Sequence, residues 1–286
     1  MKTGPPFFAV NSAIVGPIMS KTKTRMARGS VLLSERDGHV LTLTINRPDA
    51  SNAIDGMLRD ELTRALDEAA ADRQLRAILL TSAGEDAFSV GMDIAEIAGY
   101  SPLEVELVGV RARGVYDRMA SLEIPVIAAI KGACLGAGFE LALHADVRLA
   151  RSDARFGLPG INVGMNAGGG ALGRLQRVSG IGSAAALALT GGVVTAERAF
   201  MLGLVSNVTS MQDFLPSVQQ LAQHISTLSP VAVAETKKLL KIAPEQGIEA
   251  AAEQSPKSLA RCFGEGDAGV RLQMMIGGRD PESTVH

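Results

Sequence analysis

The sequence predicts a mixed α/β fold, and three features of its 286 residues support that prediction. Short apolar runs typical of buried strands alternate with longer stretches of helical spacing. Apolar residues make up 47% of the chain, which is enough for a large buried core. The chain also has 31 Gly, two Cys and no Trp, a composition that excludes collagen-like, disordered and disulfide-rich classes.

The first part of the chain is expected to alternate strands with helices. Asp37-Gly38 stands between two apolar segments, and this dipeptide is typical of a hairpin turn. Ser101-Pro102-Leu103-Glu104 has the pattern of a capping box with proline in the first turn, which predicts the start of a helix. Apolar periodicity predicts the other elements. The expected strands cover 31–34, 40–45 and 77–81, and the expected helices cover 55–71 and 101–121.

A strand–turn–helix–strand unit is predicted at the centre of the chain. Residues 126–130 are continuously apolar, and a Gly-rich turn at 135–138 leads into a helix that carries Glu140 and His144. A second strand is expected at 146–150. Beyond residue 170 the pattern is almost entirely helical, with helices expected at 171–178, 182–189, 196–201, 211–228, from Ser229-Pro230 onward, and at 245–276.

The first thirty residues differ in charge from the rest, because five basic residues precede the first acidic residue, Glu35. We interpret this segment as a disordered leader or an added, non-native segment, and an organellar transit peptide is the alternative. A secretory signal is disfavoured because prolines interrupt the apolar stretch. The predicted division is a leader at 1–29, a core at 30–228 and a C-terminal helical region at 229–286.

Composition and motifs exclude several classes of partner. The net charge of −2 gives no basic surface of the kind that nucleic-acid binders carry. Gly, Pro or a charge interrupts every apolar run before it reaches the ~20 residues needed to cross a bilayer. No pair of histidines has the spacing of metal ligands, and no nucleophile elbow, Walker loop or dinucleotide fingerprint occurs. We therefore expect no nucleic acid, membrane or metal partner.

Two Gly-flanked segments, 87–94 and 131–140, could present backbone N–H groups to a ligand. The second leads into a helix N-terminus, where partial positive charge collects. Two converging N–H donors would stabilise a carbonyl oxygen that gains negative charge during a reaction. Tight structural turns are the alternative explanation. A third segment, 164–170, is rich in Gly but lacks the Lys-Ser/Thr end of a phosphate-binding loop.

Several ordered motifs resemble those of the crotonase superfamily, which is the enoyl-CoA hydratase/isomerase family. The segment from Thr44 to Ile54 resembles its opening motif, and 88–94 and 127–142 resemble its two oxyanion loops. The resemblance runs in order over about residues 31–276. The remaining matching segments are 145–150, 155–159, 189–192, Ala196, Ala199 and 203–205.

The resemblance implies a spiral of ββα turns, a C-terminal helical trimerisation region, and a site for acyl-CoA thioesters. A homotrimer or a dimer of trimers is therefore expected, with coenzyme A as part of the substrate and no separate cofactor. In this interpretation the amides of Met92 and Ala137 hold the thioester oxygen. The CoA arm would be lined by Met92, Asp93, Ile94, Ala95 and Ala137, with Arg47 near its nucleotide end; Ala95 stands where many members have Lys.

Glu140 stands at one of the two catalytic carboxylate positions of the hydratases, and Gly160 stands where the other would be. A place in the first helical turn lowers the pKa of a Glu and burial raises it, and the residues alone leave that balance open. The predicted reaction is hydration of a 2-enoyl-CoA by a lyase of class EC 4.2.1, with Glu140 as acid and base. Because of Gly160, decarboxylation, double-bond isomerisation and a non-catalytic CoA-binding role are the alternatives.

Two further expectations concern His144 and the compartment. His144 lies four residues after Glu140 on the same helix face, so it is either a partner of Glu140 or a buried core histidine. A cytoplasmic, bacterial-type location is expected, or the mitochondrial matrix if the basic N-terminal segment is a transit peptide.

Overall fold

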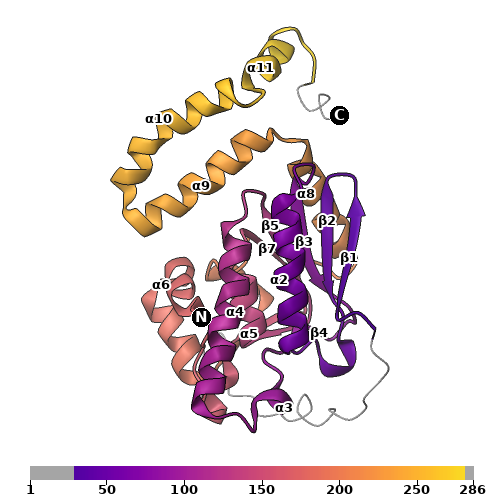
Figure 1. The fold of residues 1–286 in the computed structure, drawn as a ribbon, viewed down its shortest axis with the longest axis vertical. Coiled ribbons are helices and arrows are strands. Elements are labelled where there is room, and N and C mark those ends of the chain that lie inside the picture. Colours follow the sequence, from indigo (N-terminus) through magenta and orange to yellow (C-terminus); the bar gives the residue numbers. More distant parts are fainter. Residues whose placement is uncertain (1–28, 281–286) are drawn as a thin grey trace, which may run out of the picture.

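Two β-sheets with helices packed around them form the described part of this computed structural model, residues 29–280 (Figure 1). The predicted leader therefore lies outside the described residues, except for Gly29. The larger sheet has six strands in the order β1-β2-β3-β5-β7-β10, all parallel except for the β1–β2 hairpin. Its strands are β1 (Leu32–Asp37), β2 (Val40–Ile45), β3 (Ala77–Ser82), β5 (Val126–Ile130), β7 (Val147–Arg151) and β10 (Asn207–Thr209).

The smaller sheet gives the fold its spiral form. Its four strands are β4 (Ala87–Ser89), β6 (Ala133–Leu135), β8 (Arg155–Gly157) and β9 (Val193–Thr195). The pairs β3–β4, β5–β6 and β7–β8 each send one strand to the larger sheet and the next strand to the smaller one, and helices follow each pair. These are the ββα turns that the resemblance implies, so the predicted α/β fold is confirmed.

The helices begin largely where the local sequence predicts. The Asp55 side chain accepts from the Leu58 amide at 2.8 Å, and Ser101 and Glu104 form the expected capping box. Gly180, with φ +76°, separates the two helices predicted at 171–178 and 182–189, which adjoin as one kinked helix. The helices are α2 (Gly56–Ala71), α3 (Ile94–Ile97), α4 (Pro102–Ser121), α5 (Ala137–Leu143), α6 (Ala171–Thr190), α7 (Ala196–Met201), α8 (Phe214–Thr227), α9 (Pro230–Gln246), α10 (Ile248–Gly264) and α11 (Ala268–Ile276), with short 3₁₀ turns η1 (Pro48–Ala50) and η2 (Pro159–Val163).

The sequence did not predict the short strands β4, β6, β8, β9 and β10. Each has three residues, which is too short for a period-two pattern to appear. The four strands of the smaller sheet exist because they pair with one another, an interaction between segments far apart in the chain. The helix predicted at 211–228 also begins three residues later, at Phe214.

Helix α5 lies at the centre of the core, and every one of its seven residues is buried. By contrast, α9 and α10 form an antiparallel pair at one end of the molecule (Figure 1). No helix in residues 29–280 combines the length and apolar character that a bilayer crossing requires. The break between Leu228 and Pro230 coincides with the predicted start of a C-terminal region, although that division into domains stays a prediction.

Candidate active site

The two Gly-flanked segments meet at the N-terminus of α5. A Cβ atom built on Gly91 would lie 3.1 Å from the amide nitrogen of Ala137 and 3.1 Å from the carbonyl oxygen of Leu135. The backbone at Gly91 and at Gly136 has φ of +107° and +50°, a region that favours glycine. The two loops therefore approach each other backbone to backbone, with no side chain between them.

The amides of Met92 and Ala137 lie on these adjoining loops. Neither amide donates a backbone hydrogen bond within the described part of the chain. Their surroundings are held firmly, since the Ile54 amide donates to the Gly91 carbonyl at 2.7 Å and the Asp93 amide donates to the Ile54 carbonyl at 3.1 Å. Ala137 is the first residue of α5, and such a position has no acceptor within its own helix. Two amides on touching loops are thus available to an oxygen acceptor.

Gly138 sets how closely α5 approaches the end of β4. A Cβ atom at this position would lie 2.5 Å from the Ser89 Cβ and 2.6 Å from the Ser89 carbonyl oxygen, closer than real Cβ contacts. Ser89 is fully buried, and its hydroxyl oxygen accepts from the Gly91 amide at 3.2 Å. The lack of a side chain at residue 138 therefore permits the contact between the two loops.

Glu140 projects from the first turn of α5 and is buried, with 4% of its surface exposed. Burial raises the pKa of its carboxyl group, and hydrogen bonds from the Gly169 and Ala171 amides oppose that rise. The Gly169 amide donates to Glu140 Oε2 at 2.8 Å. The sequence alone left open whether the pKa of Glu140 is raised or lowered. It is raised, because desolvation outweighs the hydrogen bonds from the two amides.

The surroundings of Gly169 show why the segment 164–170 needs a glycine at this position. A Cβ atom on Gly169 would lie 2.3 Å from a ring carbon of Tyr116 and 2.9 Å from Glu140 Oε2. The segment crosses between these two side chains and supplies an amide to the carboxylate, which only a residue without a side chain can do here. The sequence showed the run of glycines but not which group they approach.

Tyr116, which the sequence analysis did not single out, links both ends of α5. Its hydroxyl donates to the Ala137 carbonyl oxygen at 3.1 Å, and its ring stacks on His144 at a centroid distance of 5.0 Å. His144 Nδ1 lies 2.7 Å from the Glu140 carbonyl oxygen, and burial lowers the pKa of its imidazole to about 4. His144 is therefore a neutral, packed histidine at neutral pH. The only sequence signal for Tyr116 was its place on the apolar face of α4.

Arg47 and Asp93 are bonded to each other. The Arg47 guanidinium lies 3.0 Å from Asp93 and 3.1 Å from Asp55, and only 18% of its side chain is exposed. Asp93 also accepts from the Ala95 amide at 3.1 Å, which makes it the N-cap of α3. Ile94 and Ala95 lie exposed on α3. In this structure Arg47 ties these loops together, and its contact with a CoA nucleotide stays a prediction.

Gly160 lies in η2, between β8 and the loop that carries Gly169. Its backbone is outside the left-handed region, and an added Cβ would lie 3.3 Å from the Met165 carbonyl oxygen. A Cβ atom at this position therefore requires a shift of a few tenths of an ångström by the Met165 backbone. The described residues contain no group of three His, Cys, Asp or Glu side chains placed to hold a metal ion.

Comparisons with known proteins agree with this architecture. The family model described as enoyl-CoA hydratase/isomerase matches residues 35–274. The chain is 34% identical to a short-chain-enoyl-CoA hydratase of Clostridium acetobutylicum over 85% of this chain and 92% of that protein. It is 36% identical to a 2,3-dehydroadipyl-CoA hydratase of Escherichia coli over 79% and 87% of the two chains. A crystal structure of an enoyl-CoA hydratase from Bacillus anthracis superposes with a TM-score of 0.85 at 28% identity, covering 88% of this chain and 98% of that one.

Replacing Gly138 by Ala is expected to lower the free energy of unfolding by about 1–3 kcal/mol, because the methyl group would overlap Ser89. Gly173→Ala is the matched control, since Gly173 is also helical and an added Cβ there meets nothing within 4 Å. That control should be neutral or gain up to about 1 kcal/mol. Urea unfolding measures both, and equal losses in the two variants would contradict the close-approach argument.

Proposed function

The chain belongs to the enoyl-CoA hydratase/isomerase family, and we propose that it adds water across the double bond of a 2-enoyl-CoA thioester. The observation that carries the proposal is a pair of amides on touching loops, Met92 and Ala137, which donate no backbone hydrogen bond within residues 29–280. Hydratases among its relatives, at about 34% identity over most of the chain, support an enzyme of the hydro-lyase class, EC 4.2.1. Coenzyme A is then part of the substrate, and no separate cofactor is required.

The proposed chemistry passes through a thioester enolate. The oxygen of water bonds to Cβ, and the electron pair of the double bond moves through Cα to the thioester oxygen. The amides of Met92 and Ala137 stabilise the negative charge on that oxygen, and removing one such donor typically costs 10²–10³ in rate. The proton released by water goes to Glu140, which returns it to Cα as the carbonyl re-forms.

Glu140 suits both halves of this cycle. A base must be ionised to accept the proton, and a raised pKa makes its carboxylate a stronger base than an ordinary one; the protonated group then carries that proton to Cα. Burial raises the pKa of Glu140, and the Gly169 amide fixes one oxygen at 2.8 Å. The Ala171 amide is a second hydrogen-bond donor to this carboxylate, so the group is held in place before the reaction.

The glycine at residue 160 supports a second candidate function, a different reaction of a thioester enolate. Hydration gains from two carboxylates, one for water and one for the α-proton, and this chain lacks the second. The same amides would also stabilise the enolate of a decarboxylation or a double-bond migration. A panel of enoyl-CoA, malonyl-type and β,γ-unsaturated thioesters distinguishes these reactions. Binding of every thioester without turnover would favour a CoA-binding paralogue.

We also propose a homotrimer or a dimer of trimers, built through α9, α10 and α11. Support comes from large apolar side chains that are exposed on α10 and α11. Burying them against other copies would remove apolar surface from water. The compartment, whether cytoplasmic or mitochondrial, stays a prediction. The exposed side chains are Ile248, Leu259, Phe263, Val270, Leu272, Met275 and Ile276.

Replacing Glu140 by Gln is expected to lower kcat/KM for crotonyl-CoA by about 10²–10⁴, because the group that moves the proton is lost. Glu68→Gln, at an exposed position of α2, is the matched control and should leave the rate unchanged. Formation of 3-hydroxybutyryl-CoA measures both variants. Undiminished turnover in the Glu140→Gln variant would show that Glu140 takes no part in the reaction.

In the wild-type protein, the pH dependence that arises from Glu140 has opposite signs for rate and stability. The rate should fall on acidification through a pKa above the usual 4.5, because the ionised carboxylate is needed. The raised native pKa stabilises the fold fully at pH below the unfolded value, and this contribution is lost as pH rises through the native pKa. The Gln variant should therefore be at least as stable as wild type at neutral pH, with the difference vanishing in acid.

Placing a carboxylate there with Gly160→Glu is expected to raise kcat for hydration by about tenfold or more, because a second carboxylate could act on the water. Gly160→Gln has nearly the same size without the charge and serves as the control. Steady-state kinetics on crotonyl-CoA compares the two. A folded Glu variant that is no faster than the Gln variant would show that residue 160 does not face the reacting carbons.

Replacing Tyr116 by Phe removes the hydrogen bond to the Ala137 carbonyl while it keeps the stacked ring. We expect kcat to fall several-fold with little change in KM, because the residue that carries the proposed oxyanion amide is held less firmly, and a misplaced donor acts mainly on the transition state. Tyr100→Phe, at the other tyrosine of the chain, is the control. A lower melting temperature with unchanged kcat would show that Tyr116 contributes to packing and not to the reaction.

A further inference from the structure

Helix α2 carries one charged residue on its buried face. Arg59 has 4% of its surface exposed and stands beside Leu62 and Leu66, where the helical spacing favours an apolar side chain. A charge in such a place needs a partner, because an uncompensated buried charge is costly. The partner is Glu96, whose Oε1 lies 2.9 Å from Arg59 Nη2. The pair therefore joins α2 to α3, the short helix that follows the loop of Met92.

Stability alone does not account for this pair. A buried ion pair contributes little more than well-packed apolar side chains of similar volume. In addition, Arg59 Nε and Glu96 Oε2 are buried and make no hydrogen bond within residues 29–280, which adds a desolvation cost. The remaining contact of Arg59 indicates a different role.

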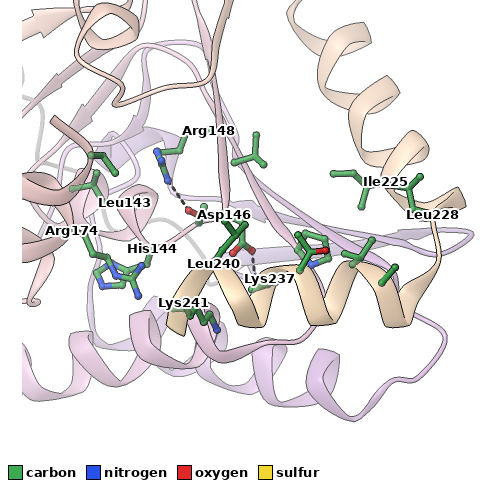
Figure 2. Close-up of a pocket in the computed structure, with 18 of the residues that line it drawn as sticks. Leu143, His144, Asp146, Arg148, Arg174, Ile225, Leu228, Lys237, Leu240 and Lys241 are labelled. Atoms are coloured by element: carbon green, nitrogen blue, oxygen red, sulfur yellow. Dashed lines mark hydrogen bonds and ion pairs between the residues drawn. The ribbon is translucent and has the colours of Figure 1, made fainter. Parts of the chain in front are cut away.

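A second buried ion pair shows the contrast. Lys237 Nζ lies 2.6 Å from Asp146 Oδ2 (Figure 2) and 2.9 Å from the Ile124 carbonyl oxygen, so it holds α9 on the core. Every buried polar atom of the Lys237 and Asp146 side chains has a partner in the described part of the chain. The pair that joins α9 to the core is thus fully bonded, and the pair of Arg59 and Glu96 is not.

Arg59 reaches the loop of Met92 through the backbone of Ile54. Its Nη1 donates to the Ile54 carbonyl oxygen at 3.3 Å. The same oxygen accepts from the Asp93 amide at 3.1 Å, and the Ile54 amide donates to the Gly91 carbonyl oxygen at 2.7 Å. The backbone of Ile54 therefore holds both peptide groups that flank the α-carbon of Met92.

These two hydrogen bonds determine the direction of the Met92 amide. The Gly91 carbonyl and the Met92 N–H belong to one planar trans peptide group, so they point in opposite directions. Holding the Gly91 carbonyl against Ile54 therefore directs the Met92 N–H away from Ile54. A shift of the Ile54 backbone would be passed to this N–H through the two bonds.

Arg59 also lies close to the residue that supports the second amide. The Tyr116 hydroxyl donates to the Ala137 carbonyl oxygen at 3.1 Å. Burial and the charge of Glu140 raise the pKa of this hydroxyl, and the positive charge of Arg59 opposes them. The guanidinium is therefore near enough to act on the support of Ala137 while it bonds to the segment that holds Met92.

We propose that Arg59 is a positioning residue for the oxyanion site: paired with Glu96, it fixes the Ile54 carbonyl and thereby the direction of the Met92 amide. The inference rests on the proposed function, because it takes this amide as a donor to the thioester oxygen. A displaced donor stabilises the developing charge less, whereas binding of the thioester depends on many other contacts. Loss of Arg59 should therefore weaken the transition state more than substrate binding.

The first test is kinetic and uses the full chain. Arg59→Met removes both bonds of the guanidinium, and we expect kcat for crotonyl-CoA to fall by about tenfold with KM within about twofold. Arg151→Met is the matched control, since Arg151 is also buried and its partners Asp153 and Glu85 lie outside both oxyanion loops. The control should lower the melting temperature and leave kcat unchanged.

The second test does not depend on hydration. Acetoacetyl-CoA forms an enolate whose negative oxygen resembles the charge that the two amides would stabilise, and its near-ultraviolet absorption reports binding. Arg59→Met should weaken this enolate by about tenfold and leave the affinity for butyryl-CoA, which carries no such charge, within about twofold. Arg151→Met should bind both ligands as wild type does.

Two further variants separate positioning from folding. Arg59→Met/Glu96→Gln leaves no buried charge without a partner and keeps the oxygen that accepts from the Gly56 amide at 3.1 Å. It should melt close to wild type and lose the same enolate affinity as Arg59→Met. Arg59→Lys should restore only part of that affinity, because a single ammonium lacks the planar fork that reaches both Ile54 and Glu96.

The outcomes distinguish this inference from the proposed function. Equal losses of enolate and butyryl-CoA affinity in a folded Arg59→Met variant would overturn the inference, because Arg59 would then support the whole site. Unchanged enolate affinity and kcat would also overturn it, since Ile54 would hold the loop without Arg59. A wild-type protein that binds the enolate but hydrates no enoyl-CoA would contradict hydration alone, and the enolate affinities would still decide on Arg59. A wild-type protein that binds no enolate would contradict both.

Discussion

The contact between two backbones at the start of α5 is the constraint on which the rest of the structure depends. Gly91 and Gly136 place one loop against the other, and Gly138 lets α5 reach Ser89 at the end of β4. The ββα spiral makes this contact possible because it stacks β4, β6 and β8 so that their following loops leave the sheet at one edge. Rigid loops matter for the proposed role of these amides, because N–H groups stabilise a developing charge only when they are held in place before the reaction.

Burial of Glu140 follows from the same arrangement. A helix packed on all sides can carry a carboxylate only if neighbouring donors offset part of the desolvation cost. The amides of Gly169 and Ala171 do so without cancelling it, and the pKa of Glu140 stays raised. In the proposed mechanism, chemistry and stability thus oppose each other at this residue, since the ionised form that would accept a proton is the form that burial disfavours.

Local signals in the sequence predicted most of the fold. The Asp37-Gly38 hairpin, the capping box at Ser101 and the strand at 126–130 depend on residues close together in the chain, and all three are confirmed. The smaller sheet, the contact of Gly169 with Glu140 and the hydrogen bond of Tyr116 were missed because each joins segments far apart. Motif resemblance indicated the loops of Met92 and Ala137, but only the fold shows that Gly91 brings them into contact.

Tyr116 and His144 extend the same arrangement to both ends of α5. The Tyr116 hydroxyl donates to the Ala137 carbonyl oxygen at 3.1 Å, and its ring stacks on His144, whose Nδ1 lies 2.7 Å from the Glu140 carbonyl oxygen. Burial lowers the pKa of His144 to about 4, so moving that pKa to 7 would take ~4 kcal/mol of new interaction. The two rings therefore support α5 as neutral groups, through packing and hydrogen bonds and not through the charge of His144.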